Sequence, residues 1–574
     1  MSSPTSLIPL RAGRVTAQFD PATLWLNHLR LGRIDLLRAI YPAYRDTRWG
    51  TPTPILAWIG REIDAEDFLL RFTASYPGLP FTWELELIGT AEGRIRYHAL
   101  GKAAETLLTN RAGFCVLHAA SIAGQLCRIE PASGGPNLGA HFPKLVSPHQ
   151  PFLDLRALTH FPGAGTTVRV LMEGEVFETE DQRNWTDASF KTYCRPLALP
   201  MPYSLEPGAG LEQQITMTVT AASDDASTTS PGSVPIRWRD LEWHPLPELG
   251  VLRTNSKPLT PEEAWALSGF RYLRADLDAT ESLSPQFQAA LADAKAMKCG
   301  LEVGLYLGEG SERYLAELAG VSTEVRRWLV FGKRSRMTEP GHLDLVRNLG
   351  LTGPVGGGSD GNFVDVNRGR PFLEGLDFAG FPMQPQQHSF DDLSVLENAG
   401  THGEVIRSAH AQYPGLEFRA PSVSLCLRRL PWEHDSPPLP ISDARLQTEF
   451  GAAWTMASLV SLIPTHVPSI TLHGTTGPCG LLDVEGEPTP IWSLLGNIYG
   501  IGATEVAVPA GPSPDQLASL MLKYPGGVRF LAVNLTAEVL AVEIDTQPYL
   551  HLNRSIRLMA RQMYWTDIPD RTSL

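Results

Sequence analysis

The chain has 574 residues, of which 43% are hydrophobic and 8% aromatic, and its formal net charge is −14 at pH 7. One hydrophobic core does not organise a chain of this length, so we expect about three domains of roughly 100–250 residues each. The charge is spread along the chain without clusters of Lys and Arg, which argues against a nucleic-acid or anionic-membrane surface. Small-molecule ligands remain open.

No stretch of the sequence approaches the ~20 apolar residues that span a bilayer. Residues 1–15 lack the pattern of a signal peptide. The six cysteines lie far apart, without a CxxC pair or a Cys/His spacing typical of zinc. We therefore expect buried free thiols in a reducing cytoplasm. Composition does not decide the oligomeric state, and a homo-oligomer is compatible with it.

Residues 1–240 are predicted to form an amino-terminal β-sandwich domain. Apolar and polar residues alternate here in short segments with turn formers between them, which is typical of antiparallel strands. These segments are 24–36, 85–97, 113–122, 168–176 and 212–220. Many short strands favour a sandwich. The polar, low-complexity run 221–235 indicates a boundary or an exposed loop.

Residues 241–500 are predicted to form a (β/α)8 barrel, because short apolar runs alternate there with helical stretches. Strands are expected near 250–251, 272–275, 301–306, 328–331, 353–356, 378–381, 423–427 and 469–472. Helices are expected at 284–297, 311–319, 443–462 and 491–499. An open doubly wound sheet is less favoured, because no GxGxxG follows the first strand.

Residues 501–574 alternate again, at 528–535 and 539–544, and predict a carboxy-terminal β-domain. The expected fold class is therefore multi-domain α/β plus β, with a central TIM-like barrel flanked by amino- and carboxy-terminal β-sandwich domains.

Polar residues that follow barrel strands are candidates for the site, since function gathers at the carboxyl ends of these strands. They are Arg274, Asp276, Glu302, Asp360, Asn362, Asp365, Asn367, Arg368, Gln384, Gln386, His388, Asp391, Asp392 and His473. The glycines at 356–358 do not fit a Walker phosphate loop, because no GK[ST] follows. They either let the backbone approach a ligand closely or form a turn capped by Asp360 and Asn362.

His388 and Asp391 are candidates for a base and its orienting carboxylate. Imidazole and carboxylates could also bind a divalent metal here, but no second histidine stands at an HxH or HxxxH spacing nearby, so a metal is not favoured and we expect no cofactor. A hydrogen-bonded structural histidine is the alternative.

The segment 180–193 (EDQRNWTDASFKTY) is the densest group of charges in the sequence. It holds Glu180, Asp181, Arg183, Asn184, Trp185, Asp187 and Lys191. Buried charges are costly unless they are paired, so the segment is either a salt-bridged cluster or a site. Trp185 beside polar groups suits the apolar face of a sugar ring.

This segment also carries a family resemblance. The stretch 173–197 (EGEVFETEDQRNWTDASFKTYCRPL) resembles the signature of the D-apionate lactonase family. The segments 113–118 (GFCVLH), 355–371 (VGGGSDGNFVDVNRGRP) and 385–398 (PQQHSFDDLSVLEN) are similar to that family too. The resemblance implies two β-domains around a barrel, and hydrolysis of D-apionolactone to D-apionate in the catabolism of apiose.

Lactone hydrolysis needs a base, a donor for the oxyanion and groups that hold the ring hydroxyls. We expect the base to be His388 with Asp391, or one of Glu180 and Asp187. Lys191 or Arg183 would stabilise the oxyanion. The expected substrate-binding residues are Asp181, Arg183, Asn184, Trp185, Arg274, Glu302, Asp360, Asn362, Gln386 and His473. This scheme requires the segment 180–193 to reach the barrel mouth.

Two rivals remain. A glycoside hydrolase with paired carboxylates in the barrel is the first, although the fourth strand (WLVFGKRSR) lacks the Asn-Glu that many such barrels carry. A non-catalytic carbohydrate-binding protein is the second, and it would need no aligned base.

Overall fold

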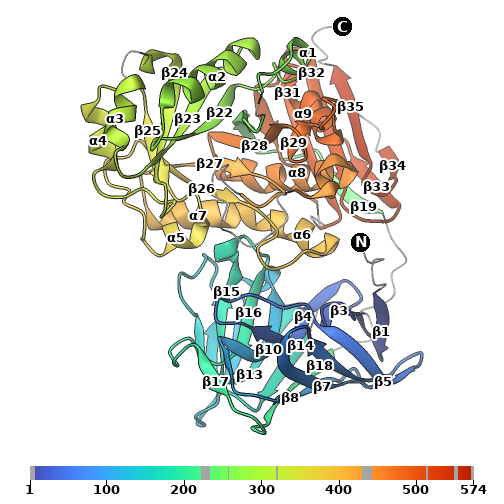
Figure 1. Cartoon of the computed structure of the whole chain (residues 1–574). Helices are drawn as coiled ribbons and strands as arrows, with labels where there is room; N and C mark the ends of the chain where they lie inside the picture. Colours follow the sequence, from blue (N-terminus) through green and yellow to red (C-terminus); the bar gives the residue numbers. More distant parts are fainter. Residues whose placement is uncertain are drawn as a thin grey trace. The chain divides into compact units, whose positions relative to one another are not determined.

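The computed structural model describes residues 7–163, 165–221, 233–255, 257–318, 321–428, 442–511, 515–547 and 554–569. The chain divides into two compact units, coloured from blue to turquoise and from green to red in Figure 1. The first unit comprises Met1–Arg183 and Ala188–Thr229, and the second comprises Asn184–Asp187 and Ser230–Leu574. In the described ranges, none of the helices has the length and apolarity needed to span a bilayer.

The first unit is built on one large antiparallel sheet. Within the described residues it has 16 strands, in the order β1-β2-β3-β4-β10-β16-β15-β13-β14-β18-β8-β7-β6-β5, with β11 and β12 beside β13. The bounds are β1 Ile8–Ala12, β2 Val15–Asp20, β3 Trp25–Leu31, β4 Ile34–Arg45, β5 Ile55–Ile63, β6 Phe68–Tyr76, β7 Leu79–Gly89, β8 Ile95–Ala103, β10 Arg111–Ala119, β11 Leu126–Pro131, β12 Leu138–His141, β13 Phe152–Gly163, β14 Thr166–Glu173, β15 Phe177–Asp181, β16 Ser189–Cys194 and β18 Leu211–Ala221. A short pair, β9 (Leu107–Thr109) and β17 (Tyr203–Leu205), lies apart.

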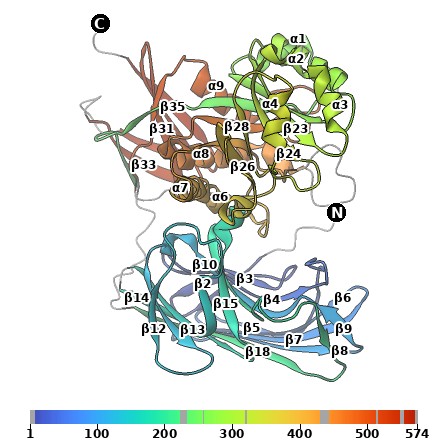
Figure 2. The ribbon, with the colours of Figure 1, turned by 90° about the vertical axis from the view of Figure 1, so that its left-hand side faces the viewer.

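This sheet folds over so that its two ends pack face to face. Phe19 of β2 lies 5.2 Å, ring to ring, from Phe72 of β6, although the two strands are far apart in the sheet order. Buried and exposed residues alternate along β6 and β7, as expected for strands with one face in a core. Figure 2 shows β18, β8 and β7 side by side in this unit. The predicted amino-terminal sandwich is thus confirmed.

The second unit contains a closed barrel. Within its described residues, eight parallel strands run in chain order and β21 pairs with β28 to close the ring. They are β21 Glu248–Leu252, β22 Tyr272–Asp278, β23 Gly300–Leu307, β24 Val325–Gly332, β25 Val355–Gly358, β26 Phe378–Met383, β27 Glu417–Val423 and β28 Ser469–Thr476. A short ninth strand, β29 (Gly480–Leu482), pairs in parallel with the end of β28. The predicted (β/α)8 barrel is confirmed.

Helices lie between most of the barrel strands, as Figure 1 shows. They are α1 Pro261–Ala266, α2 Leu283–Ala296, α3 Ser311–Leu315, α4 His342–Asn348, α5 Phe363–Asn367, α6 Asp392–Asn398, α7 His402–Gln412, α8 Glu449–Leu462 and α9 Pro490–Tyr499. Short 3-10 turns are η1 Ala120–Ile122, η2 Gln182–Trp185, η3 Ala316–Leu318, η4 Ser322–Glu324, η5 Ala399–Thr401, η6 Ala444–Gln447 and η7 Ile463–Thr465. Several starts follow from the sequence: at α1, for example, Thr260 and Glu263 form a reciprocal capping box.

Two further sheets pack together in the second unit. One has the order β20-β30-β31-β32-β35 and the other β19-β33-β34. The bounds are β19 Val234–Arg237, β20 Trp243–Pro245, β30 Glu505–Ala507, β31 Leu517–Tyr524, β32 Gly527–Asn534, β33 Leu540–Asp545, β34 Arg554–Leu558 and β35 Met563–Pro569. One buried cluster joins Ile236 and Val542 of the three-stranded sheet to Phe530 of the five-stranded sheet, which makes a second sandwich. Figure 2 shows β31, β33 and β35 of this region.

Two sequence predictions need correction here. The boundary at residue 240 is too late, because β19 and Trp238 belong to the carboxy-terminal sandwich and not to the first domain. The seventh barrel strand lies at Glu417–Val423, whereas the apolar run 423–427 follows it. Its sequence, EFRAPSV, contains Glu, Arg and Pro, so it lacks the apolar continuity of a buried parallel strand. Most of the predicted loop 221–235 lies outside the described residues.

Candidate functional site

Strand β25 leads into the site through the glycine-rich segment Val355–Gly358. A Cβ on Gly357 would stand 2.1 Å from Oγ1 of Thr338, and one on Gly358 would stand 2.3 Å from the carbonyl oxygen of Gly380. Gly358 also has φ +115°, which glycine adopts without strain. The glycines therefore serve the close packing of β25 inside the barrel. They form neither a turn capped by Asp360 nor a phosphate loop, and Asn362 occupies the amino-terminal cap position of α5 without a side-chain capping bond.

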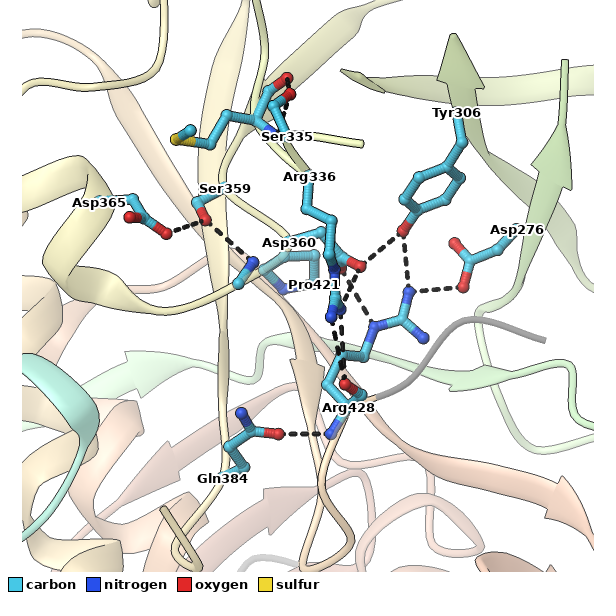
Figure 3. Close-up of polar contacts among 12 residues, drawn as sticks. Asp276, Tyr306, Ser335, Arg336, Ser359, Asp360, Asp365, Gln384, Pro421 and Arg428 are labelled. Carbon is cyan, nitrogen blue, oxygen red and sulfur yellow. Dashed lines mark hydrogen bonds and ion pairs between the residues drawn. The ribbon is translucent and has the colours of Figure 1, made fainter. Parts of the chain in front are cut away.

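Asp360 is the centre of a buried charge network at the carboxyl ends of the strands (Figure 3). Its carboxylate accepts hydrogen bonds from Arg336 at 3.0 Å, from Arg428 at 3.1 Å and from the Tyr306 hydroxyl at 2.7 Å. Arg274 lies 3.4 Å from the same group. The side chain of Asp360 has no exposed surface.

A second carboxylate, Asp276, shares these partners. It accepts from Arg428 at 2.6 Å and from Arg274 at 3.0 Å. Among the described residues, three guanidinium groups thus surround these two carboxylates. Because the charges are paired and hydrogen-bonded, their burial is tolerated.

The network fixes the protonation states of its members. Burial alone would raise the pKa of Asp360, but Arg428, Arg336 and Arg274 outweigh it and hold that pKa well below its ordinary value. Burial, with the nearby Asp276 and Asp360, raises the pKa of the Tyr306 phenol well above its usual range. Asp360 is therefore an anion and Tyr306 a neutral donor across the physiological pH range.

Arg336 differs from the other two arginines in its exposure. The side chains of Arg274 and Arg428 are 0% and 5% exposed, whereas that of Arg336 is 21% exposed. Arg336 stands in the loop after β24 (Val325–Gly332), where barrel side chains face the mouth. Arg336 is therefore the most exposed of the three arginines in this network.

A histidine–carboxylate pair stands beside this network, after strand β26. His388 Nδ1 lies 2.5 Å from Oδ2 of Asp187. The Asp187 side chain is 3% exposed and also accepts a 3.3 Å bond from the amide of Asn398, whereas His388 is 24% exposed. The ring of Trp185 meets that of His388 edge to face, with 5.9 Å between centroids. Asp187 and Trp185 belong to the four residues Asn184–Asp187 that form part of the second unit.

Gln384 connects this pair to the charge network. Its carbonyl accepts a 2.6 Å bond from the hydroxyl of Thr186, next to Asp187. Its side-chain oxygen accepts from the backbone N–H of Arg428, a contact drawn in Figure 3. The ends of β25, β26 and β27 therefore converge with the Asn184–Asp187 segment on one site.

Several other predicted residues support the site rather than face it. Asp391 caps α6, since its carboxylate accepts from the backbone of Ser394, so the carboxylate that orients His388 is Asp187. Gln386 is 4% exposed and donates to Asp443 and to the carbonyl of Leu425. Asn184 accepts a 2.8 Å bond from Asn367.

Two predicted substrate-binding residues lie away from the mouth. Glu302 is the third residue of β23, near its amino-terminal end, where it pairs with Arg327. His473 contacts α8 on the outside of the barrel, because its Nε2 lies 2.8 Å from the hydroxyl of Thr455 and its ring packs on Trp454. Burial lowers the pKa of His473 to about 3, so it is neutral. Glu302 is kept from the mouth by its position along the strand, and His473 by the direction of its side chain. Neither property can be derived from the sequence.

The remaining predicted residues lie in the first unit. Asp181 and Arg183 form a 2.6 Å ion pair without exposed surface, and Arg183 also donates to the carbonyl of Pro143. These two residues form the salt-bridged cluster that was the alternative prediction. Glu180 and Lys191 face each other on β15 and β16 with 3.2 Å between their charged atoms. Both are largely buried.

The sequence analysis missed Tyr306, Arg336 and Arg428 as site residues. Arg428 directly follows the apolar run 423–427, and Arg336 follows the fourth strand. The rule that polar residues after barrel strands are site candidates would therefore have included both. Tyr306 gave no such signal, because an aromatic residue inside a strand is usual in a core.

The barrel, with polar side chains gathered at the carboxyl ends of its strands, has the architecture of a TIM-barrel enzyme. Residues 2–222 match the family model described as D-apionate lactonase, N-terminal domain, and residues 256–503 match that of the D-apionate lactonase TIM barrel domain. The chain belongs to the D-apionate lactonase family. A D-apionate lactonase of Brucella anthropi is 28% identical over 93% of each chain.

Solved structures resemble the chain more distantly. A GH30 endoxylanase from Clostridium papyrosolvens is 11% identical and covers 58% of this chain and 99% of its own, with a TM-score of 0.40. A β-arabinopyranosidase is 12% identical, covers 98% of both chains and has a TM-score of 0.30. At these TM-scores neither likeness bears on activity.

Proposed function

We propose that the protein hydrolyses D-apionolactone to D-apionate, in the catabolism of apiose, with His388 as the general base. The observation that carries this proposal is the short contact between His388 and Asp187 at the barrel mouth. Family membership supplies the substrate.

The pair supports base catalysis through its hydrogen bond. A proton on Nδ1 is donated to Asp187, which leaves Nε2 as the basic nitrogen of the ring. Nε2 takes a proton from water as the water attacks the lactone carbonyl, and Asp187 stabilises the resulting imidazolium. The proton then passes to the ring oxygen as the carbon–oxygen bond breaks, which gives the free hydroxyl and the carboxylic acid. The acid ionises to the carboxylate and releases one proton to the solvent.

The charge network supports the other half of the reaction. Negative charge develops on the carbonyl oxygen during attack and ends on the carboxylate product. We assign its stabilisation to Arg336, whose guanidinium is partly exposed while its pairing with Asp360 holds it in place. Trp185, partly exposed beside His388, would cover the apolar face of the ring. This assignment replaces Arg183, whose guanidinium is buried and paired.

We propose that the step needs no metal at the mouth, because a five-membered lactone is reactive and His388 is already oriented by a carboxylate. The cytoplasm is the proposed location, supported by the six free cysteines, four of them buried.

A glycoside hydrolase is less well supported. That chemistry needs one carboxyl group that can donate a proton near neutral pH. Asp360 is held as an anion by three arginines, and Glu302 pairs with Arg327 near the opposite end of its strand. Among the carboxylates described here, the pair Asp276 and Asp360 is therefore poorly suited to an acid-and-nucleophile role.

The test is turnover of D-apionolactone by purified protein, with acid release followed at constant pH. His388→Ala and Asp187→Asn should each lower kcat by about 10²-fold or more while the fold persists. Asp391→Asn is the matched control, because asparagine also caps helices and this carboxylate is not the partner of His388. It should retain full turnover.

Unchanged turnover in both the His388 and Asp187 variants would refute the assigned base. A wild-type protein that leaves the lactone intact but cleaves an aryl glycoside would refute the proposed reaction. Turnover that disappears with a chelator and returns with a divalent ion, while thermal unfolding is unchanged by the chelator, would refute the metal-free step.

A further inference from the structure

Three potential metal ligands meet at the end of the barrel opposite the mouth. They are Glu242, His244 and His466, and their ligand atoms all lie within 4.8 Å of one another. His244 lies in β20, which precedes the first barrel strand, and His466 ends the turn η7 just before the eighth. Both therefore stand near the amino-terminal ends of barrel strands, away from the His388 site.

Local structure explains how these side chains converge. Glu242 and His244 are two residues apart at the start of a strand, so they share one face. His466 has φ +59°, and this left-handed conformation turns the chain sharply between α8 and β28. The rings of His244 and His466 meet edge to face, with 4.7 Å between their centroids.

The second observation is a buried nitrogen without a partner. His244 is 4% exposed, and among the described residues its Nδ1 has no hydrogen-bond partner. A buried imidazole nitrogen left in this way costs free energy unless something binds it. A cation bound through this nitrogen, together with Glu242 and His466, would remove that cost.

We propose that Glu242, His244 and His466 bind a divalent transition-metal ion of the zinc type. Two imidazoles and one carboxylate suit zinc, nickel or cobalt, whereas magnesium and calcium prefer all-oxygen sites. At zinc–ligand distances of about 2.1 Å, tetrahedral ligand atoms stand about 3.4 Å apart, so the exposed Glu242 needs only a small side-chain rotation to close the site.

The surroundings leave room for a fourth ligand. A pocket of about 380 Å³ opens onto Glu242 and His244 and is also lined by Pro464 and Val508. Water in this pocket would complete the coordination. His410 on α7 is electrostatically close as well: burial has the largest effect and lowers its pKa, Glu417 raises it, and His466 lowers it. A cation at His466 would lower the pKa of His410 further.

Such an ion would join two parts of the second unit. Through β20 it would hold the five-stranded sheet, and through His466 it would hold the link between α8 and β28. It would stabilise this unit without entering the reaction. Metal-ligand spacings within one segment do not indicate this site, because His244 and His466 are far apart in the sequence.

The experiment titrates the metal-free full-length protein with zinc chloride in a calorimeter, and with magnesium chloride in parallel. We expect one zinc ion per chain and no magnesium binding at that site. Thermal unfolding should shift upward by about 5 °C or more at a free zinc concentration about 100 times Kd. Visible absorption of bound cobalt(II) would report the coordination independently of activity.

Two variants and one control decide the assignment. Glu242→Gln and His466→Asn should each weaken zinc binding by about tenfold or more, and asparagine tolerates the left-handed conformation of residue 466. His98→Asn, at a partly exposed histidine of the first unit, should bind zinc as the wild type does. Turnover of the lactone should be the same in all three.

Equal zinc affinity in the wild type and both ligand variants would overturn the proposal, as would the absence of zinc binding to the wild type. Because the readout is binding and unfolding, either result is independent of whether the protein hydrolyses the lactone.

Discussion

The charge network around Asp360 predicts a large and pH-dependent stability effect. Replacing Asp360 with asparagine keeps the shape of the side chain but removes the negative charge that three guanidinium groups share. Arg274 and Arg428, which are 0% and 5% exposed, would then share only Asp276. The buried positive charge becomes uncompensated.

Breaking a buried ion pair by removing one partner costs about 3–5 kcal/mol. Asparagine retains one oxygen that accepts from Tyr306, so we expect the lower end, about 3 kcal/mol. Tyr306→Phe is the matched comparison, because it removes the 2.7 Å hydrogen bond to Asp360 without changing charge. It should cost about 1 kcal/mol.

The pH dependence follows from the lowered pKa of Asp360, for which the three arginines outweigh the effect of burial. A carboxyl with a lowered native pKa contributes stability above its unfolded pKa of about 3.9, and that contribution is lost as the pH falls through the native pKa. The difference between wild type and Asp360→Asn should therefore be complete at pH 7 and shrink below about pH 4.

Urea unfolding at both pH values, followed by intrinsic fluorescence, measures this difference in the transition of the second unit. A loss below about 1 kcal/mol at pH 7, or a loss of the same size at pH 7 and pH 3, would show that the charge of Asp360 does not hold the network together.

Three further predictions follow from other buried positions. In the same urea titration, Gly358→Ala should destabilise the second unit by about 2 kcal/mol or more, because its Cβ would meet the Gly380 carbonyl and its φ is +115°. Gly496→Ala in α9 is the control: the space around its Cβ is open, so it should be neutral or stabilising. Burial lowers the pKa of His402 to about 3, so the wild type should lose stability as the pH falls below about 6.5, where the unfolded chain binds the proton. His402→Phe should flatten the dependence of Tm on pH between 7 and 4. An unchanged slope would contradict this. The Sγ atoms of Cys426 and Cys479 lie 2.7 Å apart, so oxidised glutathione should convert these two thiols into a disulfide and release reduced glutathione. Peptide mapping should find this disulfide and should find Cys299 outside it.

Much of the barrel could be predicted because buried parallel strands are continuous apolar runs. The second, third and fourth strands show such runs, and the predicted segments lie within β22, β23 and β24. Strand β27 escaped this pattern because its sequence is EFRAPSV. The sequence also did not indicate that β19 belongs to the carboxy-terminal sandwich, because β19 pairs with β33, which follows the whole barrel in the chain.

The site was harder to predict, because the decisive contacts join distant segments. Asp187 and His388 are 201 residues apart, and the sequence offered Asp391, Glu180 and Asp187 as equivalent carboxylates. Their tertiary contacts distinguish these carboxylates: Asp391 caps a helix and Glu180 forms a cross-strand ion pair, whereas Asp187 contacts the imidazole of His388. A sequence pattern in one segment can predict the residue types of a site. Which of these side chains a substrate can reach depends on their burial and on the hydrogen bonds and ion pairs that they already form.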